Sequence, residues 1–489
     1  MKAALLHGSF GLPDQQNIQT GGPLKVRASI ASLTRRIRCI LVLRFEADGL
    51  TGFAGLALLQ HYFATLKVQA RIVNTLRGRV PNIDIGVGRA VMVLLLLIIT
   101  GGRRIHHLGY LQHDPLVRRF CGARQLPSSR TFNRWLAAMD SDAVVALQRL
   151  NEELIAQDLR GTCGTRLTVD VDGSVVSTGM TVEGAKRGYN PHHRKVPSYY
   201  PITAYEARSG RVLRVQNRAG NVHDGKASVG FLGDLLGQIK RTLPAIRTIE
   251  CRMDGAFFLA EVLDLLDQHH TKYAIKVPFW RGLDLQRVIR GATHWSRADE
   301  DVDYLHHTLE MAGWQRFVRV IIFRKRVHHP SAKNFQLDLF DPSNGYYEYS
   351  AAATNLDLTG DALWQFVCGR GTHEKVYGEL KRGFAFACLP SRKYHANSAW
   401  QVLSIIAFNL MRGFQVATDA PARPTNLKRR TKHCFESIHT ARFTWLNRPG
   451  LIRRPQGKET LDVGTIPEVF LKFTAIQSAL AEHRRFMSN

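Results

Sequence analysis

Acidic residues interrupt two apolar strand-like runs in a chain that is otherwise rich in lysine and arginine. Asp170 and Asp172 share one face of an alternating run, and Asp254 ends a second one. Burying an unpaired carboxylate costs on the order of several kcal/mol, so each acid needs a cation, hydrogen-bond donors or water. A strand cap or an ion pair with Arg166 or Arg252 would satisfy one such acid. Two together also suit a divalent metal ion, which prefers carboxylate oxygens.

A third acid lies in a helix predicted over residues 361–382. With about 100° per residue, Glu374 lies about 40° from Arg370 and Lys381 about 20° from it, so the three share one face. A carboxylate between two cations can bind a metal ion while the cations bind phosphates. A surface ladder of ion pairs gives the same pattern and contributes little stability.

The elements that must position these acids form a mixed sheet flanked by helices. Between residues 165 and 278 the predicted order is three strands, a helix, a strand, a helix and a strand, which is typical of an α/β fold. Residues 279–345 contain further strand-like runs and predict a β-rich insertion. One more strand at 346–354 then precedes the helices predicted at 361–382 and 397–417.

The first part of the chain predicts helices. After a leader without periodicity, apolar residues recur three or four apart through this region. Residues 126–136 predict a turn, an N-cap and an amphipathic helix that carries Arg130 and Arg134, compatible with a helix-turn-helix entering DNA. A solvated basic helix is equally typical of this pattern. The ten apolar residues 90–99 are about half of a membrane span and predict a buried helix instead.

Composition narrows the class of partner. The 489 residues include 67 Lys+Arg against 40 Asp+Glu, a formal charge of +27, and 45% are hydrophobic. Such a chain can bury a core, which excludes a disordered basic tail, and its charge favours nucleic acid over a membrane surface. The seven cysteines are scattered without a C-x-x-C pair, so a reducing cytoplasm fits better than a disulfide framework or zinc ribbon.

Two basic segments suit phosphate binding. Residues 186–195, which begin with Lys186 and Arg187, link two predicted strands and either contact DNA or form a solvated loop. Residues 423–458 have ten Lys/Arg and the single acid Glu436, which predicts a mobile phosphate-binding tail.

The order of the acids and the spacing Arg370, three residues, Glu374, six residues, Lys381 resemble the DDE transposases of bacterial insertion sequences. The resemblance is to the group with a Tyr-Arg-Glu-Lys signature and a β insertion before the catalytic helix, and it covers residues 165–418. This chain has Val367 where the signature has Tyr.

The resemblance implies an RNase H-like mixed sheet with flanking helices, a β-rich insertion before the catalytic helix and an α-helical N-terminal region. The expected parts follow the chain in order: a flexible leader at 1–25, a helical DNA-binding region at 26–160, an RNase H-like catalytic domain at 165–278 and 346–418, the insertion at 279–345 and a basic C-terminal region at 419–489.

For the chemistry, the resemblance implies a catalytic and metal-binding triad of Asp172, Asp254 and Glu374. Asp172 is preferred because Gly and Ser follow it, with Asp170 as the reserve. Two Mg2+ ions, replaceable by Mn2+, would be held with Asp172 bridging both. The residues expected to contact DNA are basic: Arg370, Lys381, Arg130, Arg134, Lys186 and Arg187.

The activity implied is cleavage at insertion-sequence ends and joining of the 3′ ends to target DNA. The expected partners are double-stranded DNA and a second copy of the chain on paired ends, in the bacterial cytoplasm at the nucleoid and without a membrane. A nuclease without strand transfer and a catalytically inactive, transposase-derived DNA-binding protein are the alternatives.

Overall fold

The computed structural model describes residues 48–178, 182–188, 195–222, 224–327, 347–418, 420–423, 428–464 and 466–488. The predicted leader at 1–25 and the start of the predicted helical region lie outside these residues. The described residues from Gly49 onward form one compact unit.

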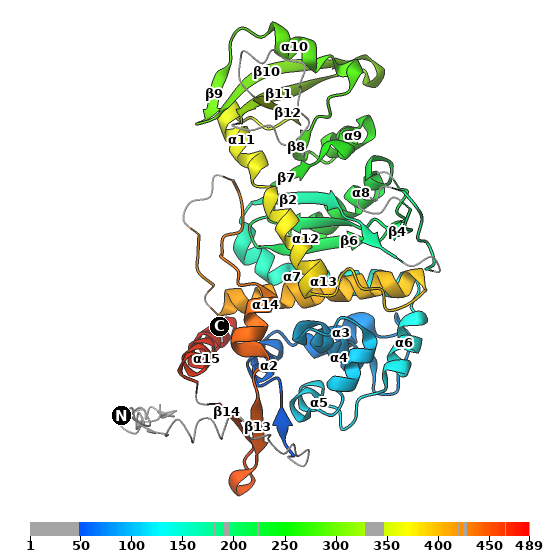
Figure 1. The fold of residues 1–489 in the computed structure, drawn as a ribbon, viewed down its shortest axis with the longest axis vertical. Coiled ribbons are helices and arrows are strands. Elements are labelled where there is room, and N and C mark those ends of the chain that lie inside the picture. The colour runs from blue at the N-terminus through cyan, green and yellow to red at the C-terminus, as the bar shows by residue number, and fades with distance from the viewer. Residues whose placement is uncertain are drawn as a thin grey trace, which may run out of the picture. The chain divides into compact units, whose positions relative to one another are not determined.

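A nine-stranded mixed sheet forms the centre of the fold, with the order β6-β5-β2-β7-β8-β12-β11-β10-β9 (Figure 1). Strand β2 pairs antiparallel with β5 and parallel with β7, and β7 is parallel to β8. Three antiparallel strands followed by two parallel ones are the RNase H-like arrangement, so the predicted fold class is confirmed. The strands of this sheet are β2 (Arg166–Gly173), β5 (Ile202–Glu206), β6 (Arg211–Gln216), β7 (Thr248–Met253), β8 (Lys272–Lys276), β9 (Ser296–Asp299), β10 (Val302–Met311), β11 (Arg316–Arg326) and β12 (Tyr347–Thr354).

The predicted insertion adds strands to this sheet. Strand β12 pairs antiparallel with β8, and β11, β10 and β9 follow in turn. Buried residues of β11 such as Val320 belong to the same apolar cluster as Leu167 of β2. The insertion therefore continues the core of the central sheet, and its residues 328–346 lie outside the described part.

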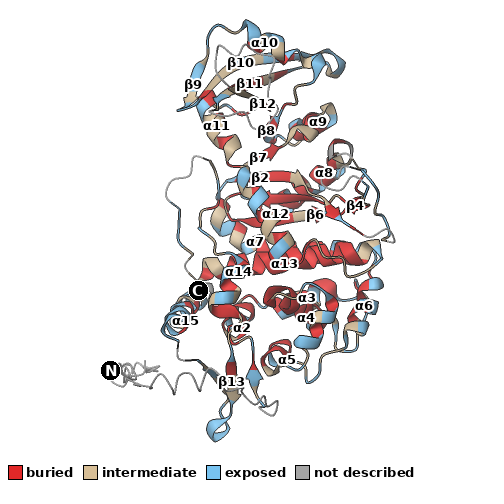
Figure 2. Ribbon diagram, in the orientation of Figure 1, coloured by how far each residue is buried: buried red, intermediate tan, exposed pale blue. Residues whose placement is uncertain are grey.

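Two apolar helices pack below the sheet. Helix α13 (Tyr394–Ala417) is buried along nearly its whole length (Figure 2) and contacts α4, α7 and β6. Helix α4 (Val87–Thr100) contains the ten-residue apolar run, which is fully buried as predicted. A helix that is apolar all round is stable only inside a core. No described helix combines the length and the apolar character that a membrane span requires.

The remaining helices surround these layers. Those of the N-terminal part are α2 (Leu56–Thr65), α3 (Val68–Leu76), α5 (Pro115–Cys121), α6 (Ser129–Ala137) and α7 (Ser141–Cys163). Those after the first sheet strands are α8 (Asp224–Thr242), α9 (Ala260–Gln268), α10 (Leu285–Gly291), α11 (Gly360–Cys368), α12 (Gly371–Gly383), α14 (Ile438–Ala441) and α15 (Pro467–Ser488). Short strands β3 (Val176–Ser177) and β4 (Ser198–Tyr199) pair with each other, and β1 (Leu50–Thr51), β13 (Gly450–Arg453) and β14 (Thr460–Val463) form a third sheet.

The prediction of one continuous helix over 361–382 is wrong, because the helix breaks between α11 and α12. In an uninterrupted helix the Phe366 carbonyl would accept a hydrogen bond from the Arg370 amide. Here it accepts one from the Arg252 guanidinium, at 2.8 Å. The Arg370 amide turns to the Val367 carbonyl at 3.0 Å, which tightens the chain at this point.

The prediction of a mobile tail over 423–458 is also wrong for the described residues. This segment contains α14, a π-helix at Arg442–Leu446 and strand β13, which pairs with both β1 and β14. The Arg442 guanidinium donates to the carbonyls of Ile98, Ile99 and Gly383 at 2.7–2.8 Å. Arg442 therefore joins α4 to the end of α12.

Candidate active site

Two of the predicted acids lie at one edge of the sheet. Strands β2 and β7 are parallel neighbours whose last paired residues are Val171 and Met253. Asp172 and Asp254 directly follow these two residues, so both carboxylates come from the carboxyl ends of adjacent strands. The local sequences explain the position, because alternation keeps Val169 and Val171 in the core while the strand ends at Gly173.

Asp170, the reserve candidate, is fully buried beneath this edge. The Arg252 Nε donates to Asp170 Oδ1 at 2.5 Å and the Nη2 donates to Oδ2 at 2.8 Å. The two residues are direct partners in the β2–β7 register. Both carboxylate oxygens are therefore engaged in a bidentate ion pair.

Asp172 is only partly buried and pairs with Arg370. The Arg370 Nη2 lies 2.8 Å from Asp172 Oδ2, and the Gly173 amide donates to Asp172 Oδ1 at 2.9 Å. Burial lowers the pKa of Arg370, but the charges of Asp172 first, then Asp254, Asp170 and Glu374, raise it by more, so the net pKa lies above its ordinary value. Of the three predicted catalytic acids, Asp172 pairs directly with Arg370, whereas Asp254 and Glu374 act on its charge from a distance.

Asp254 and Glu374 occupy the starts of helical turns. Asp254 Oδ1 accepts the Ala256 amide at 3.0 Å and caps the 3-10 helix Gly255–Phe257. Glu374 lies exposed in the first turn of α12. The structure thus places Asp172 and Asp254 at adjacent strand ends, and Glu374 on the helix that begins directly after Arg370, the partner of Asp172.

The carboxylates have the hard oxygen donors that Mg2+ and Mn2+ prefer. As arranged, no three His, Cys, Asp or Glu side chains of the described ranges lie close enough to hold a metal ion. Arg370 is paired with Asp172 Oδ2, so its guanidinium must leave this oxygen before the oxygen can bind a metal ion. The donor chemistry therefore fits a divalent cation that competes with this guanidinium.

Lys381 lies beside the site but is bonded within the protein. Its Nζ donates to Ser174 Oγ at 2.5 Å and to the Val175 carbonyl at 2.8 Å. Burial lowers the pKa of Lys381, and the nearby Asp172 opposes this shift. Lys381 thus ties α12 to the segment that follows Asp172, and its predicted contact with DNA stays a prediction.

An aromatic stack that the sequence analysis missed joins α12 to the sheet. The His373 ring stacks on Tyr205 at 5.5 Å and on Tyr377 at 5.0 Å between centroids. The Tyr377 hydroxyl donates to the Asp172 carbonyl at 2.9 Å, and His373 Nε2 lies 3.1 Å from Thr203 Oγ1. The signal in the sequence was the spacing of His373 and Tyr377, which places both on one helix face.

This stack predicts acid sensitivity. Burial first, then Arg370 and Arg252, lower the pKa of His373 from 6.5 to about 3. Between these values the unfolded chain binds a proton that the folded protein does not, so the free energy of unfolding falls as the pH falls, by up to about 1.4 kcal/mol per unit. Urea unfolding from pH 6.5 to pH 4 in metal-free buffer measures this slope.

The control for this slope is His373→Phe, which keeps a ring between Tyr205 and Tyr377 but cannot titrate. Carboxylates contribute equally to both proteins, so the difference in slope isolates His373. Equal slopes for the two proteins would show that His373 binds its proton equally in the folded and unfolded states.

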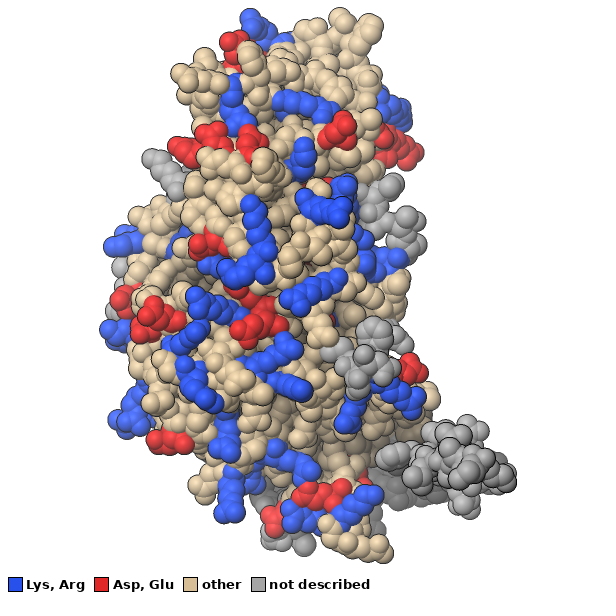
Figure 3. Space-filling view, turned by 180° about the vertical axis from the view of Figure 1, so that it is seen from behind, with Lys and Arg blue, Asp and Glu red and all other residues tan. Residues whose placement is uncertain are grey.

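The other predicted DNA contacts lie on separate elements. Arg130 and Arg134 are exposed on α6, whose N-cap Ser128 accepts the Thr131 amide at 3.3 Å as the sequence predicted. Lys186 and Arg187 are exposed in the segment before β4. Figure 3 shows Lys and Arg spread along one whole face of the molecule, interspersed with smaller groups of Asp and Glu.

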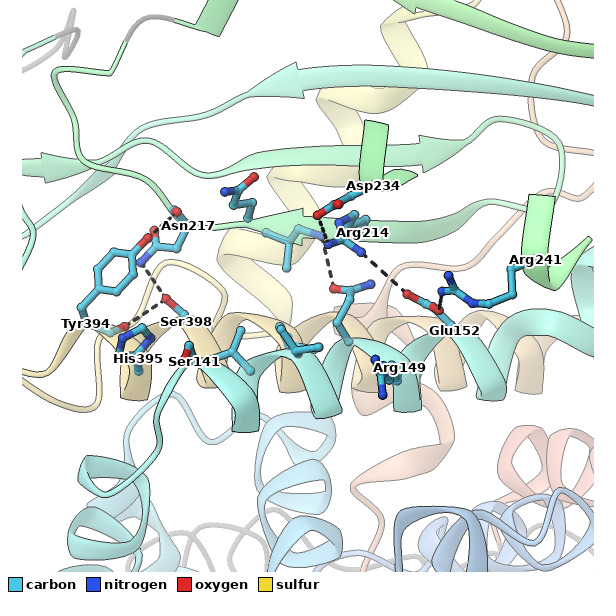
Figure 4. Close-up of a pocket in the computed structure, with 16 residues that line it drawn as sticks. Ser141, Arg149, Glu152, Arg214, Asn217, Asp234, Arg241, Tyr394, His395 and Ser398 are labelled. Carbon is cyan, nitrogen blue, oxygen red and sulfur yellow. Dashed lines mark hydrogen bonds and ion pairs between the residues drawn. The ribbon is translucent and has the colours of Figure 1, made fainter. Parts of the chain in front are cut away.

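A cavity of about 460 Å³ between α7, β6, α8 and α13 contains none of the predicted site residues (Figure 4). Four of its charged side chains form ion pairs, Arg214 with Asp234 and Arg241 with Glu152, each at 2.7 Å. The first pair joins β6 to α8, and the second joins α8 to α7.

Comparisons with known proteins identify the family. Curated protein sequences give no match. Among solved structures, the piggyBac transposase synaptic complex with hairpin DNA is similar, with 10% sequence identity, a TM-score of 0.37 and coverage of 88% of this chain and 81% of that chain. The family described as "Transposase DDE domain group 1" matches residues 35–431. The chain therefore belongs to the DDE-domain transposases of group 1.

Proposed function

We propose that this transposase is a metal-dependent enzyme that cuts DNA at the ends of an insertion sequence and joins the 3′ ends to target DNA. The observation that carries the proposal is the placement of Asp172 and Asp254 at the carboxyl ends of the parallel strands β2 and β7, with Asp172 2.8 Å from Arg370, which directly precedes the helix that carries Glu374. A cation-binding group of acids beside exposed basic surface is the arrangement that phosphodiester chemistry requires.

Asp172, Asp254 and Glu374 would hold the Mg2+ or Mn2+ ions through their carboxylate oxygens. When bound, such ions supply an activated hydroxyl and stabilise the leaving 3′ oxygen. We assign this role to Asp172 rather than to Asp170, because Arg252 donates to both oxygens of the fully buried Asp170. Arg370, once displaced from Asp172, provides a bidentate donor for a DNA phosphate.

The partner is double-stranded DNA, which the net charge of +27 and the exposed Arg130, Arg134, Lys186 and Arg187 would bind through phosphates. We place the enzyme at the bacterial nucleoid and infer a homodimer, because two transposon ends must be cut and joined together.

The test is incubation of the full chain with Mg2+ and a duplex that carries the element's end. Cleavage followed by joined product supports the proposal, and EDTA should abolish both. Cleavage without joining would favour a nuclease, whereas DNA binding without cleavage would indicate an inactive descendant of a transposase.

Arg370→Gln should bind Mn2+ about tenfold more tightly than the unaltered protein, because the substitution removes the guanidinium that competes with the metal ion for Asp172. Mn2+ titration followed by electron paramagnetic resonance, without DNA, measures this change. The same variant should cleave DNA more slowly, since it loses a phosphate donor. The control is Arg166→Gln, which removes an arginine 2.6 Å from the buried Glu250, outside the site. Unchanged Mn2+ affinity in Arg370→Gln would contradict competition between the guanidinium and the metal.

A further inference from the structure

We propose that Arg252 is a positioning residue that sets the break between α11 and α12 and thereby fixes Arg370 and Glu374 relative to Asp172. The proposal rests on the proposed function, in which Glu374 is a catalytic acid. Arg252 is 1% exposed and lies in β7, two residues before Asp254.

The Arg252 guanidinium joins three separate parts of the chain. Two of its nitrogens hold Asp170 of β2 at 2.5 and 2.8 Å. Its Nη1 donates to the Phe366 carbonyl in α11 at 2.8 Å and to the Lys428 carbonyl at 2.9 Å. Asp170 thus fixes the orientation of the guanidinium, and the guanidinium fixes the end of α11.

The backbone around the break shows the effect of this contact. The amides of Gly369, Arg370 and His373 bond to carbonyls three residues earlier, at 2.9–3.1 Å, rather than four. The chain is thereby tightened over the residues that carry Arg370 and lead into Glu374. Without the donor from Arg252, the Phe366 carbonyl could accept the Arg370 amide and continue the helix.

Gly369 leaves the space that this contact needs. A Cβ on Gly369 would lie 1.9 Å from the Lys428 carbonyl oxygen and 2.1 Å from Arg252 Nη1. Its φ of −61° and ψ of −26° are open to any residue, so space alone requires glycine here. At Gly371, two residues later, a Cβ would meet no described atom within 4 Å, so this glycine offers a matched comparison.

A second arginine supports the same junction. The Arg429 guanidinium lies over the Phe366 ring at 4.9 Å, and that of Arg252 lies over the same ring at 5.1 Å. Arg429 also pairs with Glu250, a fully buried residue of β7. The Phe366 backbone and side chain are therefore both held by cations anchored to buried acids.

Arg252→Lys tests the proposal, because lysine keeps a charge beside Asp170 but cannot reach both oxygens and two carbonyls at once. The matched control is Arg211→Lys in β6, since Arg211 is also 1% exposed and pairs with Asp158. Both variants should lower the unfolding temperature. Only Arg252→Lys should lower kcat for DNA cleavage, by about thirtyfold or more, with KM for DNA changed less than about threefold.

Hydrogen exchange of the amides at 369–376 gives a readout that does not depend on activity. Exchange should rise about tenfold or more in Arg252→Lys and stay unchanged in Arg211→Lys. Equal loss of kcat in both variants, or unchanged exchange in Arg252→Lys, would overturn the proposal. If the exchange result holds while Glu374→Gln still cleaves DNA, the assignment of the catalytic acid fails and the role of Arg252 in placing the helix stands.

Gly369→Ala disturbs the same contact, because the added methyl group would collide with the Arg252 guanidinium and the Lys428 carbonyl. It should lower kcat as Arg252→Lys does, whereas Gly371→Ala should leave cleavage unchanged. Because both disruptive changes act on one contact, the double variant Arg252→Lys/Gly369→Ala should lose much less than the product of the single effects. Multiplication of the single effects would show that Arg252 and Gly369 act independently and would contradict the proposal.

Discussion

We expect Asp172→Asn to lower the rates of both DNA cleavage and strand joining by about 10³-fold or more while the protein stays folded. An amide has one oxygen and no charge, so it would bind metal ions far more weakly than the carboxylate, and such a fall in rate corresponds to the loss of several kcal/mol of transition-state stabilisation. Asp172 is partly buried and lies at the strand end, so the fold tolerates the change. Single-turnover cleavage with Mg2+, alongside a thermal unfolding curve, measures both effects.

Two comparisons make this result specific. Asp284→Asn changes an exposed acid at a φ of 47°, which asparagine accepts, and should leave cleavage unchanged. Asp170→Asn should instead destabilise the protein by about 3–5 kcal/mol, because it leaves the buried Arg252 charge unbalanced. Full activity of Asp172→Asn would remove Asp172 from the triad.

We expect Arg442→Met to lower the free energy of unfolding by about 3–5 kcal/mol without changing how DNA binding depends on salt. The Arg442 guanidinium satisfies two carbonyls at the end of α4 and one at the end of α12, and methionine would leave all three without this donor. Burial already lowers the pKa of Arg442 to about 10, although Glu379 opposes the shift. The midpoint of urea unfolding and a salt titration of DNA affinity measure the two quantities.

Arg453→Met is the control for stability, since Arg453 is exposed and pairs with Asp462 on the neighbouring strand, so the cost should stay within about 0.5 kcal/mol. Arg130→Gln is the comparison for binding. Loss of one phosphate contact there should reduce the slope of log affinity against log salt by about 0.9. A reduced slope in Arg442→Met would mean that this side chain contacts DNA after all.

The succession of strands and helices along the chain could be predicted because it depends on patterns within short stretches of sequence. Alternation in β2 and the turn between β5 and β6 are visible within a few residues, and the acids of β2 and β7 were conspicuous among apolar neighbours. The convergence of Asp172 and Asp254 follows from the parallel pairing of these strands.

The break before α12 could not be predicted, because its cause lies far away in the chain. Arg252 and Phe366 are separated by 114 residues, and nothing near Phe366 indicates the donor. The packed C-terminal segment was missed for the same reason. A run of Lys and Arg is typical of solvated surface, whereas Arg442 finds its carbonyl partner at Ile99, 343 residues away.

The pairing of β1 with β13 has a consequence for how the protein is made. Leu50 lies opposite Leu451, so this strand pair joins residues that lie near the two ends of the described sequence. Contacts between such distant residues form late and slowly. A nascent chain on the ribosome cannot complete this part of its core until residue 451 has been synthesised. A chain terminated before residue 450 therefore leaves the β1 edge without its partner strand.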